Sequence, residues 1–421
     1  MFGMDFLPKS LLMLTPDGRL LFLTRILRLF GYGFLSVILV IYLKSIGLSQ
    51  DQVGWLLALT LVGDAVISLG ISLIADTVGR KYMLRVGALL MVFAGILFAF
   101  TDNFAFLLLA AVIGVISPSG NEVGPFLAIE QASLSHLVGD DKRTGVFAWY
   151  NLLGFCATAL GALMVGVFFK TLTGLRLDVL TSYKIIVLIY GVLGLVLWFL
   201  FGRLSGKIEV NAQEKPLNFT ELLNSRLGIH QSLPLVLQLS SLFALDAFAG
   251  GFIMQSLLAY WFHVRFGADI AVLGVLFFGA NLFAGVSSLL AVRLARRIGL
   301  INTMVFTHLP SNVLLVLVVF MPNLTWAGIV FLLRCTISQM DVPARQAYLM
   351  AVVAPSERSA AGGIANVART LGASFAPLLA LPLLGTPTLA GIPIILAGGL
   401  KIIYDLLLFY NFKKSSSPEG H

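Results

Sequence analysis

Long apolar runs recur along the whole chain, with short polar turns between them. Most are about 20 residues long, which is the length that a helix needs to cross the roughly 30 Å hydrocarbon core of a bilayer. Charged residues make up only 11% of the 421 residues, against about 25% in soluble domains. Because so few charges cannot cover a water-exposed surface, the sequence predicts an all-α integral membrane protein.

Twelve of these runs can be read as transmembrane helices in two groups of six. We expect them at residues 20–43, 53–75, 83–101, 105–136, 144–169, 182–202, 231–262, 270–295, 301–321, 325–353, 359–385 and 388–411. A polar stretch with charges of both signs separates the sixth run from the seventh. The sequence therefore predicts six-helix bundles at residues 1–204 and 231–412, a linker at 205–230 and a tail at 413–421.

The distribution of Lys and Arg predicts the orientation. With both termini on the cytoplasmic side, far more Lys and Arg fall in inner loops than in outer ones, as the positive-inside rule requires. The formal charge of +8 then reflects basic loops that face anionic lipid, and it does not indicate a nucleic-acid partner. We expect a multi-pass protein of the cell membrane, plasma or inner, that acts as a monomer.

The two halves resemble each other in sequence. The segment FGYGFLSVILVIYL, from Phe30, aligns with FAGGFIMQSLLAYW, from Phe248. The segment IEQASLSHLVGDDKRTGVFAWYN aligns with ARQAYLMAVVAPSERSAAGGIAN and pairs Gln131 with Gln346. Matches in the same order and at similar offsets indicate a duplicated, pseudo-symmetric six-helix unit. Halves of this kind around a central site are typical of secondary transporters.

The turn between the second and third runs reads SLIADTVGRKYML, from Ser72 to Leu84. It is similar to the Gly-x-x-x-Asp-Arg-x-Gly-Arg-Arg signature of the major facilitator superfamily. Ser72 replaces the first Gly and Thr77 replaces the first Arg. The positions that match are Asp76, Gly79, Arg80 and Lys81.

With the twelve runs, the linker and the repeat, the chain resembles the major facilitator superfamily over nearly its whole length. The resemblance implies the twelve-helix fold of that family and two halves that rock about a cavity lined by helices 1, 4, 7 and 10. It also implies that the turn motif is a gating latch. A positive-inside turn without a gating role is the alternative interpretation.

Ionisable side chains at bilayer depth are costly unless they pair or face a water-filled cavity. The segments NEVGPF and MDVPAR, in the fourth and tenth runs, place Glu122 and Asp341 two or three residues before a proline. A proline disrupts a helical hydrogen bond, so each helix can kink there and present a carbonyl to a cavity. Each acid is therefore a candidate for binding a proton or a cationic substrate. A permanent ion pair with a neighbouring Arg is the alternative.

Other charges fall at matching positions of the repeat. Glu130 matches Arg345 with opposite charge, which predicts an ion pair between the halves at the inner gate, and Arg28 matches Asp246 in helices 1 and 7. The substrate or proton candidates are Arg28, Asp64, Glu122, Asp246, Asp341 and Arg369, and the gating candidates are Asp76, Gly79, Arg80, Lys81, Glu130 and Arg345.

Three further charges are expected to have structural roles. Lys401 and Asp405 are four residues apart on one helical face, so we expect them to neutralise each other. Arg25 is near the cytoplasmic end of helix 1, where we expect it to reach the lipid headgroups.

The sequence predicts a secondary transporter that works by alternating access. By family analogy, the first choice is proton-coupled export of a small organic compound. The alternatives are proton-coupled uptake of a polar or anionic solute, recognised by Arg28, Arg345 and Arg369, and a non-transporting sensor. The chain contains none of the His-Glu-x-x-His, Gly-x-Ser-x-Gly or phosphate-loop motifs, so we expect no enzyme activity, no cofactor and no metal. The expected partners are a small solute, protons and the lipid bilayer.

Overall fold

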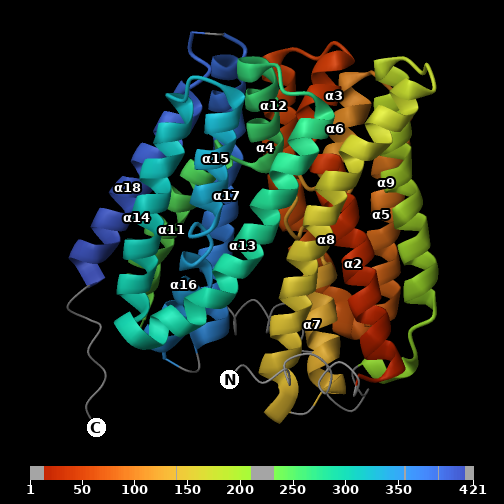
Figure 1. The fold of residues 1–421 in the computed structure, drawn as a ribbon. Helices are drawn as coiled ribbons and strands as arrows, with labels where there is room; N and C mark the ends of the chain where they lie inside the picture. The colour runs from red at the N-terminus through yellow and green to blue at the C-terminus, as the bar shows by residue number, and fades with distance from the viewer. Residues whose placement is uncertain (1–13, 139, 210–231, 355–356, 387, 413–421) are drawn as a thin grey trace, which may run out of the picture.

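The structure is a computed structural model that describes residues 14–138, 140–209, 232–354, 357–386 and 388–412. Within these ranges every regular element is a helix, and the helices lie side by side (Figure 1). Most of the expected linker and the expected tail lie outside the described residues.

The helices fall into two groups along the chain. The first contains α2 (Pro16–Ser36), α3 (Leu39–Ser45), α4 (Gln50–Val78), α5 (Arg80–Phe100), α6 (Phe104–Ile113), α7 (Phe126–Leu137), α8 (Asp140–Gly174), α9 (Val179–Gly202) and the short η1 (Gly206–Ile208). The second contains α11 (Leu233–Gly251), α12 (Gln255–Phe266), α13 (Ile270–Ile298), α14 (Leu300–Val319), α15 (Leu324–Cys335), α16 (Asp341–Val352), α17 (Arg358–Leu384) and α18 (Ile392–Phe412).

The described helices account for twelve crossings. Nine spans are long and apolar enough to cross a bilayer, and α2 and α3, which meet at 46°, form a tenth as a bent pair. The shorter apolar helices α6 and α15 each continue, after a break, into α7 and α16. This arrangement confirms the predicted all-α fold with twelve transmembrane helices.

Crossings one, four, seven and ten are interrupted, and the breaks separate α2 from α3, α6 from α7, α11 from α12 and α15 from α16. Pro125 and Pro343 lie at or near the start of α7 and α16, where a missing backbone N–H is tolerated. The two proline-containing runs are therefore broken, as the sequence predicts. The same interruption in the first and seventh crossings gives the two halves matching architectures.

The halves join along two pairs of helices, α8 with α13 and α4 with α17. Among the described residues, the hydrogen bonds that cross between the halves all involve α12: Gln255 Nε2 to Ser36 Oγ at 2.8 Å, Gln50 Nε2 to the Tyr260 hydroxyl at 3.2 Å, and Ser256 N to Pro118 O at 3.0 Å. In Figure 1, α3 and α12 lie at the upper end of the bundle and α7 and α16 at the lower end. The upper end is therefore the end at which hydrogen bonds hold the halves together.

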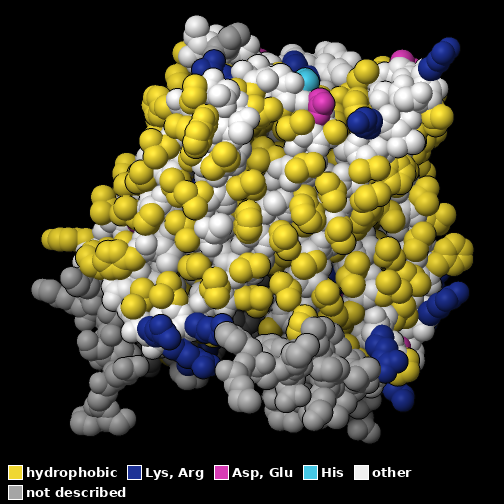
Figure 2. Space-filling model, viewed as in Figure 1, with side chains coloured by type: hydrophobic (Ala, Val, Ile, Leu, Met, Phe, Trp, Pro, Cys, Tyr) yellow, Lys and Arg dark blue, Asp and Glu magenta, His cyan; other side chains and the backbone are white. Residues whose placement is uncertain are grey.

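The surface agrees with a membrane-spanning bundle. Figure 2 shows hydrophobic side chains across the middle of the face in view, with Lys and Arg gathered toward its two ends. At the lower end, Gly79 separates α4 from α5 with φ at +116°, and Gly299 separates α13 from α14 with φ at +83°. Both turns need this left-handed backbone, which glycine adopts without a steric penalty.

Candidate functional site

Arg28 of α2 and Glu130 of α7 form a buried ion pair with two parallel hydrogen bonds. Arg28 Nη1 donates to Oε1 of Glu130 at 2.8 Å, and Nη2 donates to Oε2 at 2.6 Å. Both side chains are 0% exposed. Thr24 also donates to Oε1, at 3.1 Å, and the Tyr150 hydroxyl donates to Oε2. Bidentate pairs of this kind are among the strongest hydrogen-bonded arrangements in proteins.

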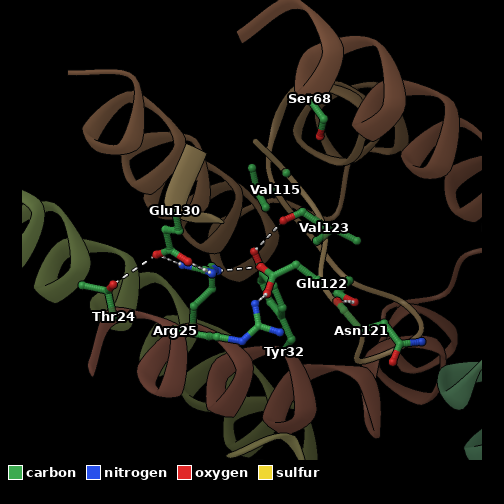
Figure 3. Close-up of polar contacts among 12 residues, drawn as sticks. Thr24, Arg25, Tyr32, Ser68, Val115, Asn121, Glu122, Val123 and Glu130 are labelled. Carbon is green, nitrogen blue, oxygen red and sulfur yellow. Dashed lines mark hydrogen bonds and ion pairs between the residues drawn. The ribbon is translucent and has the colours of Figure 1, made fainter. Parts of the chain in front are cut away.

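Glu122 lies in the break between α6 and α7 and joins the two arginines of α2 (Figure 3). Its Oε2 accepts from Arg25 Nη1 at 2.9 Å, and its Oε1 accepts from Arg28 Nε at 2.7 Å. The Arg25 guanidinium also lies 4.0 Å from the centre of the Tyr150 ring. The expectation that Arg25 reaches the lipid headgroups is therefore wrong, because its partners lie inside the bundle and leave its side chain 7% exposed.

Among the described residues, Asp64 of α4 has no ion pair, unlike the carboxylates in the interior of the bundle that bind an arginine. Those carboxylates are Glu122, Glu130, Asp246 and Asp341. Its Oδ1 accepts from the Gly124 N–H at 2.5 Å and from Ser68 Oγ at 3.2 Å. Gly124 has φ at +80° and lies two residues after Glu122. Asp64 therefore ties α4 to the broken segment that carries Glu122.

Asp246 of α11 organises the charges of the second half. Its oxygens accept from Arg345 Nη1 at 2.8 Å, Arg369 Nη1 at 3.3 Å and Lys401 Nζ at 2.5 Å. Asp341 also accepts from Arg345 Nη1, at 3.2 Å. The Arg369 side chain is 32% exposed, whereas the side chains of the other four residues are buried. Arg369 therefore has the most exposed cationic side chain of this cluster.

Lys401 and Asp405 do not neutralise each other, so that expectation is wrong. Lys401 binds Asp246 of α11, and Asp405 is bonded to His308 and Asn312 of α14, at 2.8 Å and 2.9 Å. The reason is that α18 packs against both α11 and α14. Each side chain meets a partner on a different neighbouring helix.

His308 and Asn312 were missed by reasoning from the sequence. The only signal is the segment THLPSN, which places a His and an Asn four residues apart in an otherwise apolar run. This spacing puts both side chains on one helical face. Their importance follows only from Asp405, which lies 93 residues further along the chain than Asn312.

Glu130 and Arg345 do not form the predicted ion pair between the halves. Glu130 binds Arg28, and Arg345 binds Asp246 and Asp341, so each charge is neutralised within its own half. Buried charges require partners that are already close, and the helix that carries each charge packs on its own bundle.

The turn between α4 and α5 binds the segment that follows α9. Asp76 accepts from Arg80 Nε at 2.7 Å, within one helical turn. The backbone N–H groups of Arg80 and Lys81 donate to Glu209 at 2.6 and 3.1 Å, and Lys81 Nζ donates to Leu204 O at 2.8 Å. Glu209 was missed by the sequence analysis. It places a negative charge at the N-terminus of α5, where the helix dipole favours one.

Comparisons with known proteins agree with this architecture. The family model described as "Major Facilitator Superfamily" matches residues 21–409. The uncharacterized membrane protein YJR124C of Saccharomyces cerevisiae is 28% identical in an alignment 417 positions long that covers 93% of each chain. The quinolone resistance protein NorA of Staphylococcus aureus is 32% identical over 106 residues, 25% of this chain and 27% of NorA.

A solved structure of a mutant of the nucleoside transporter NupG has a TM-score of 0.76 at 12% identity and covers 94% of this chain and 99% of its own. At this identity the likeness concerns the fold alone. The family match spans nearly all of the described crossings, and it agrees with their number and their division into two halves. The chain therefore belongs to the major facilitator superfamily and is a multi-pass secondary transporter.

Proposed function

We propose that the chain is an antiporter that exchanges protons for a small organic solute and exports that solute. Asp64 is the observation that carries this proposal. A carboxylate in the membrane interior without a cation nearby binds a proton more readily than one held in an ion pair. Four other interior carboxylates, Glu122, Glu130, Asp246 and Asp341, are held by arginines, so Asp64 takes up a proton before any of these four.

Proton binding at Asp64 acts on the broken fourth crossing. The charged Oδ1 holds the Gly124 N–H at 2.5 Å, and a neutral carboxyl accepts this bond more weakly. The segment between α6 and α7 is then freer to move and takes Glu122 with it. Glu122 forms ion pairs with Arg25 and Arg28 of α2. Protonation of Asp64 therefore changes the contacts of these two arginines.

The hydrogen bonds between the halves support alternating access. They lie toward the upper end, and the predicted orientation makes that end external, with both termini cytoplasmic. We propose that the bundles of residues 1–204 and 231–412, with the linker at 205–230 between them in the chain, rock as bodies about the central cavity. Breaking the α12 contacts at one end and forming contacts near Glu130, Arg345 and the Asp76–Lys81 turn at the other would complete the cycle. The protein would act as a monomer in the cell membrane.

Export of an organic compound is supported by the partial similarity to NorA, whose name refers to quinolone resistance. Uptake of a polar or anionic solute is the second candidate, and the partial exposure of Arg369 favours it. Of the three arginines predicted to recognise an anion, Arg28 and Arg345 are buried in ion pairs. Arg369 is therefore the one that can bind the anion directly.

The first experiment identifies the solute. Thermal unfolding of the purified chain in detergent is followed against drugs, organic anions, nucleosides, sugars and amino acids, because a ligand of the folded state raises the midpoint. The ligand found is then loaded into proteoliposomes, and its flux is measured with and without a pH gradient. A flux that the gradient does not change would contradict proton coupling.

The matched variants are Asp64→Asn and Asp51→Asn, both in α4. Asp51 is exposed in the first turn of the helix and serves as the control. We expect Asp64→Asn to keep the ligand-induced rise of the midpoint and to lose the acceleration by the pH gradient, whereas Asp51→Asn behaves like the parent. Equal acceleration in both variants would remove Asp64 from the proton path.

A further inference from the structure

His308 lies in the middle of α14 and is 3% exposed. Its Nδ1 is 2.8 Å from Oδ1 of Asp405, and Asn312 Nδ2 donates to the other oxygen of the same carboxylate at 2.9 Å. Its Nε2 is 4.0 Å from Oδ1 of Asp246, the oxygen that also accepts from Lys401. The imidazole therefore lies between two buried carboxylates, with one ring nitrogen toward each.

The corresponding helices of the first half show that this polarity is not required for packing. There, α5 packs against α9 through Gly95 and Gly191, so closely that a Cβ on Gly95 would lie 2.6 Å from the Gly191 Cα. In the second half, α14 and α18 also approach closely at a glycine, since a Cβ on Gly398 would lie 3.1 Å from the Asn312 carbonyl oxygen, and they carry the His308–Asp405 contact in addition. Close packing at a glycine occurs in both halves, so packing alone does not account for the polar pair of His308 and Asp405.

Two further polar atoms beside the imidazole have no hydrogen-bond partner among the described residues. They are Oγ of Ser311 and Oδ1 of Asn312, and both residues are fully buried. Buried polar atoms without protein partners are normally satisfied by water. The hydrogen-bonding capacity of this part of α14 is therefore not used up by protein contacts.

From these contacts, we propose a second proton-binding site at the junction of α11, α14 and α18, formed by His308 and Asp405 and linked to Asp246. It rests on the proposed proton coupling and names where the second proton is held. Imidazole is the side chain whose charge changes near neutral pH, and here a carboxylate lies on the side of each ring nitrogen. The step transfers one proton from a hydronium ion to a ring nitrogen: an O–H bond of hydronium breaks, an N–H bond forms, and a water molecule is left.

The charged groups around the imidazole determine what its protonation does. Lys401, Tyr404 and Asp405 of α18 and Asp246 of α11 face it, and the described residues of α13 and α15 contribute no ion pair to it. Arg345 and Arg369, from α16 and α17, lie one contact further away, on Asp246. A proton on His308 places a new cation beside Asp246, which then holds its other cations less tightly.

Arg369 has the most exposed side chain and the longest hydrogen bond of the three cations on Asp246, so it is released first. The released guanidinium can turn toward the solute path. Protonation of His308 thereby changes the affinity for the solute. A metal ion is not the ligand, because the described residues contain no group of three or more His, Cys, Asp or Glu side chains that could hold one.

The direct test observes His308 itself. The full chain is labelled with ¹⁵N-histidine, and His136, His230, His263 and His421 are replaced by Gln so that His308 is the only histidine. Ring-nitrogen NMR in detergent is recorded from pH 5 to pH 8.5. We expect the signals to change from the neutral to the doubly protonated form within this range. Signals of one neutral tautomer throughout would overturn the inference.

Asp405→Asn tests the partner without removing the ring. At the same pH, the doubly protonated signal of His308 should be weaker in this variant than in the parent. Asp51→Asn, outside the cluster, should leave it unchanged. An unchanged titration in Asp405→Asn would exclude Asp405 from the site.

Transport separates this inference from the proposed function. With the solute found by thermal unfolding, protons moved per solute are counted in proteoliposomes by an internal pH dye. His308→Gln should bind the solute and move fewer protons per solute than the parent. An unchanged ratio would overturn the inference and leave the proposed function standing. If the parent moves no protons while His308 titrates, the proposed coupling fails and the proton-binding site stands.

Discussion

Arg28 and Glu130 neutralise each other inside the membrane, with both guanidinium–carboxylate hydrogen bonds at 2.8 Å or less. A pair of this kind is costly to break on one side only, because the removal of Glu130 leaves the fully buried Arg28 with Glu122 as its one remaining carboxylate partner among the described residues. The energetic importance of this contact can be measured without knowing the solute.

Glu130→Leu should lower the free energy of unfolding by about 3 kcal/mol, because Arg28 loses its bidentate partner and keeps only its bond to Glu122. The double variant Arg28→Met/Glu130→Leu should lose less than the sum of the single variants Arg28→Met and Glu130→Leu. Unfolding by denaturing detergent checks both values. Additive losses would show that the two charges do not stabilise each other.

Replacement by Gln should destabilise the protein more at Arg345 than at Arg369. Arg345→Gln removes a buried cation from two acids and should cost about 3–5 kcal/mol of stability. Arg369→Gln removes a partly exposed cation with a single bond at 3.3 Å and should cost at most about 1 kcal/mol. Thermal unfolding compares the two variants. If the solute is anionic, Arg369→Gln should also abolish its effect on the midpoint, and an undiminished effect would place the anion elsewhere.

Gln255 connects the halves at the upper end. It donates to Ser36 and accepts from Asn281 Nδ2 at 2.9 Å. Gln255→Ala should weaken closure there by about 1 kcal/mol, which corresponds to about a fivefold change in the open population. The reporter is maleimide labelling of Ser256→Cys, a fully buried position, in a background without Cys156 and Cys335.

We expect labelling of the reporter to become about fivefold faster with Gln255→Ala. Arg265→Ala, an exposed change near the end of the same helix, is the control and should leave the rate unchanged. Equal rates in all three proteins would mean that Gln255 does not contribute to closure.

Glu209 holds the start of α5 to the segment after α9. Glu209→Ala should cost about 1 kcal/mol locally, since two backbone donors lose a charged acceptor. Hydrogen exchange of residues 79–83 and 204–209 should then be faster. Lys207→Ala, an exposed residue of η1, is the control. Protection that persists in Glu209→Ala would contradict a capping role.

The sequence predicted the crossings well, because apolar length alone identifies a span. It also predicted the breaks beside Pro125 and Pro343, which have a local chemical cause. The breaks between α2 and α3 and between α11 and α12 contain no proline and were not predicted. They depend on packing within the bundle, which a linear pattern does not contain.

The charged members of both clusters were also found from the sequence, but their pairing was not. Lys401 and Asp405 share a helical face, yet their partners are decided by α11 and α14 on either side. Arg25 illustrates the same limit, since Glu122 and Tyr150 come from other segments. Pairing depends on how each helix is rotated, and that information lies in the tertiary structure.

The charge balance of the two clusters has a consequence for how membrane voltage acts on the protein. Arg25 and Arg28 balance Glu122 and Glu130, and the cations around Asp246 balance the three acids of the second half while His308 is neutral. Asp64 belongs to neither cluster, and its described partners are the Gly124 N–H and the Ser68 hydroxyl, which carry no charge. A unit charge that moves across a membrane potential of 100 mV changes its electrostatic free energy by about 2.3 kcal/mol. The membrane potential therefore exerts a force on Asp64 while its carboxylate is ionised. It exerts no such force once the carboxyl is protonated and neutral.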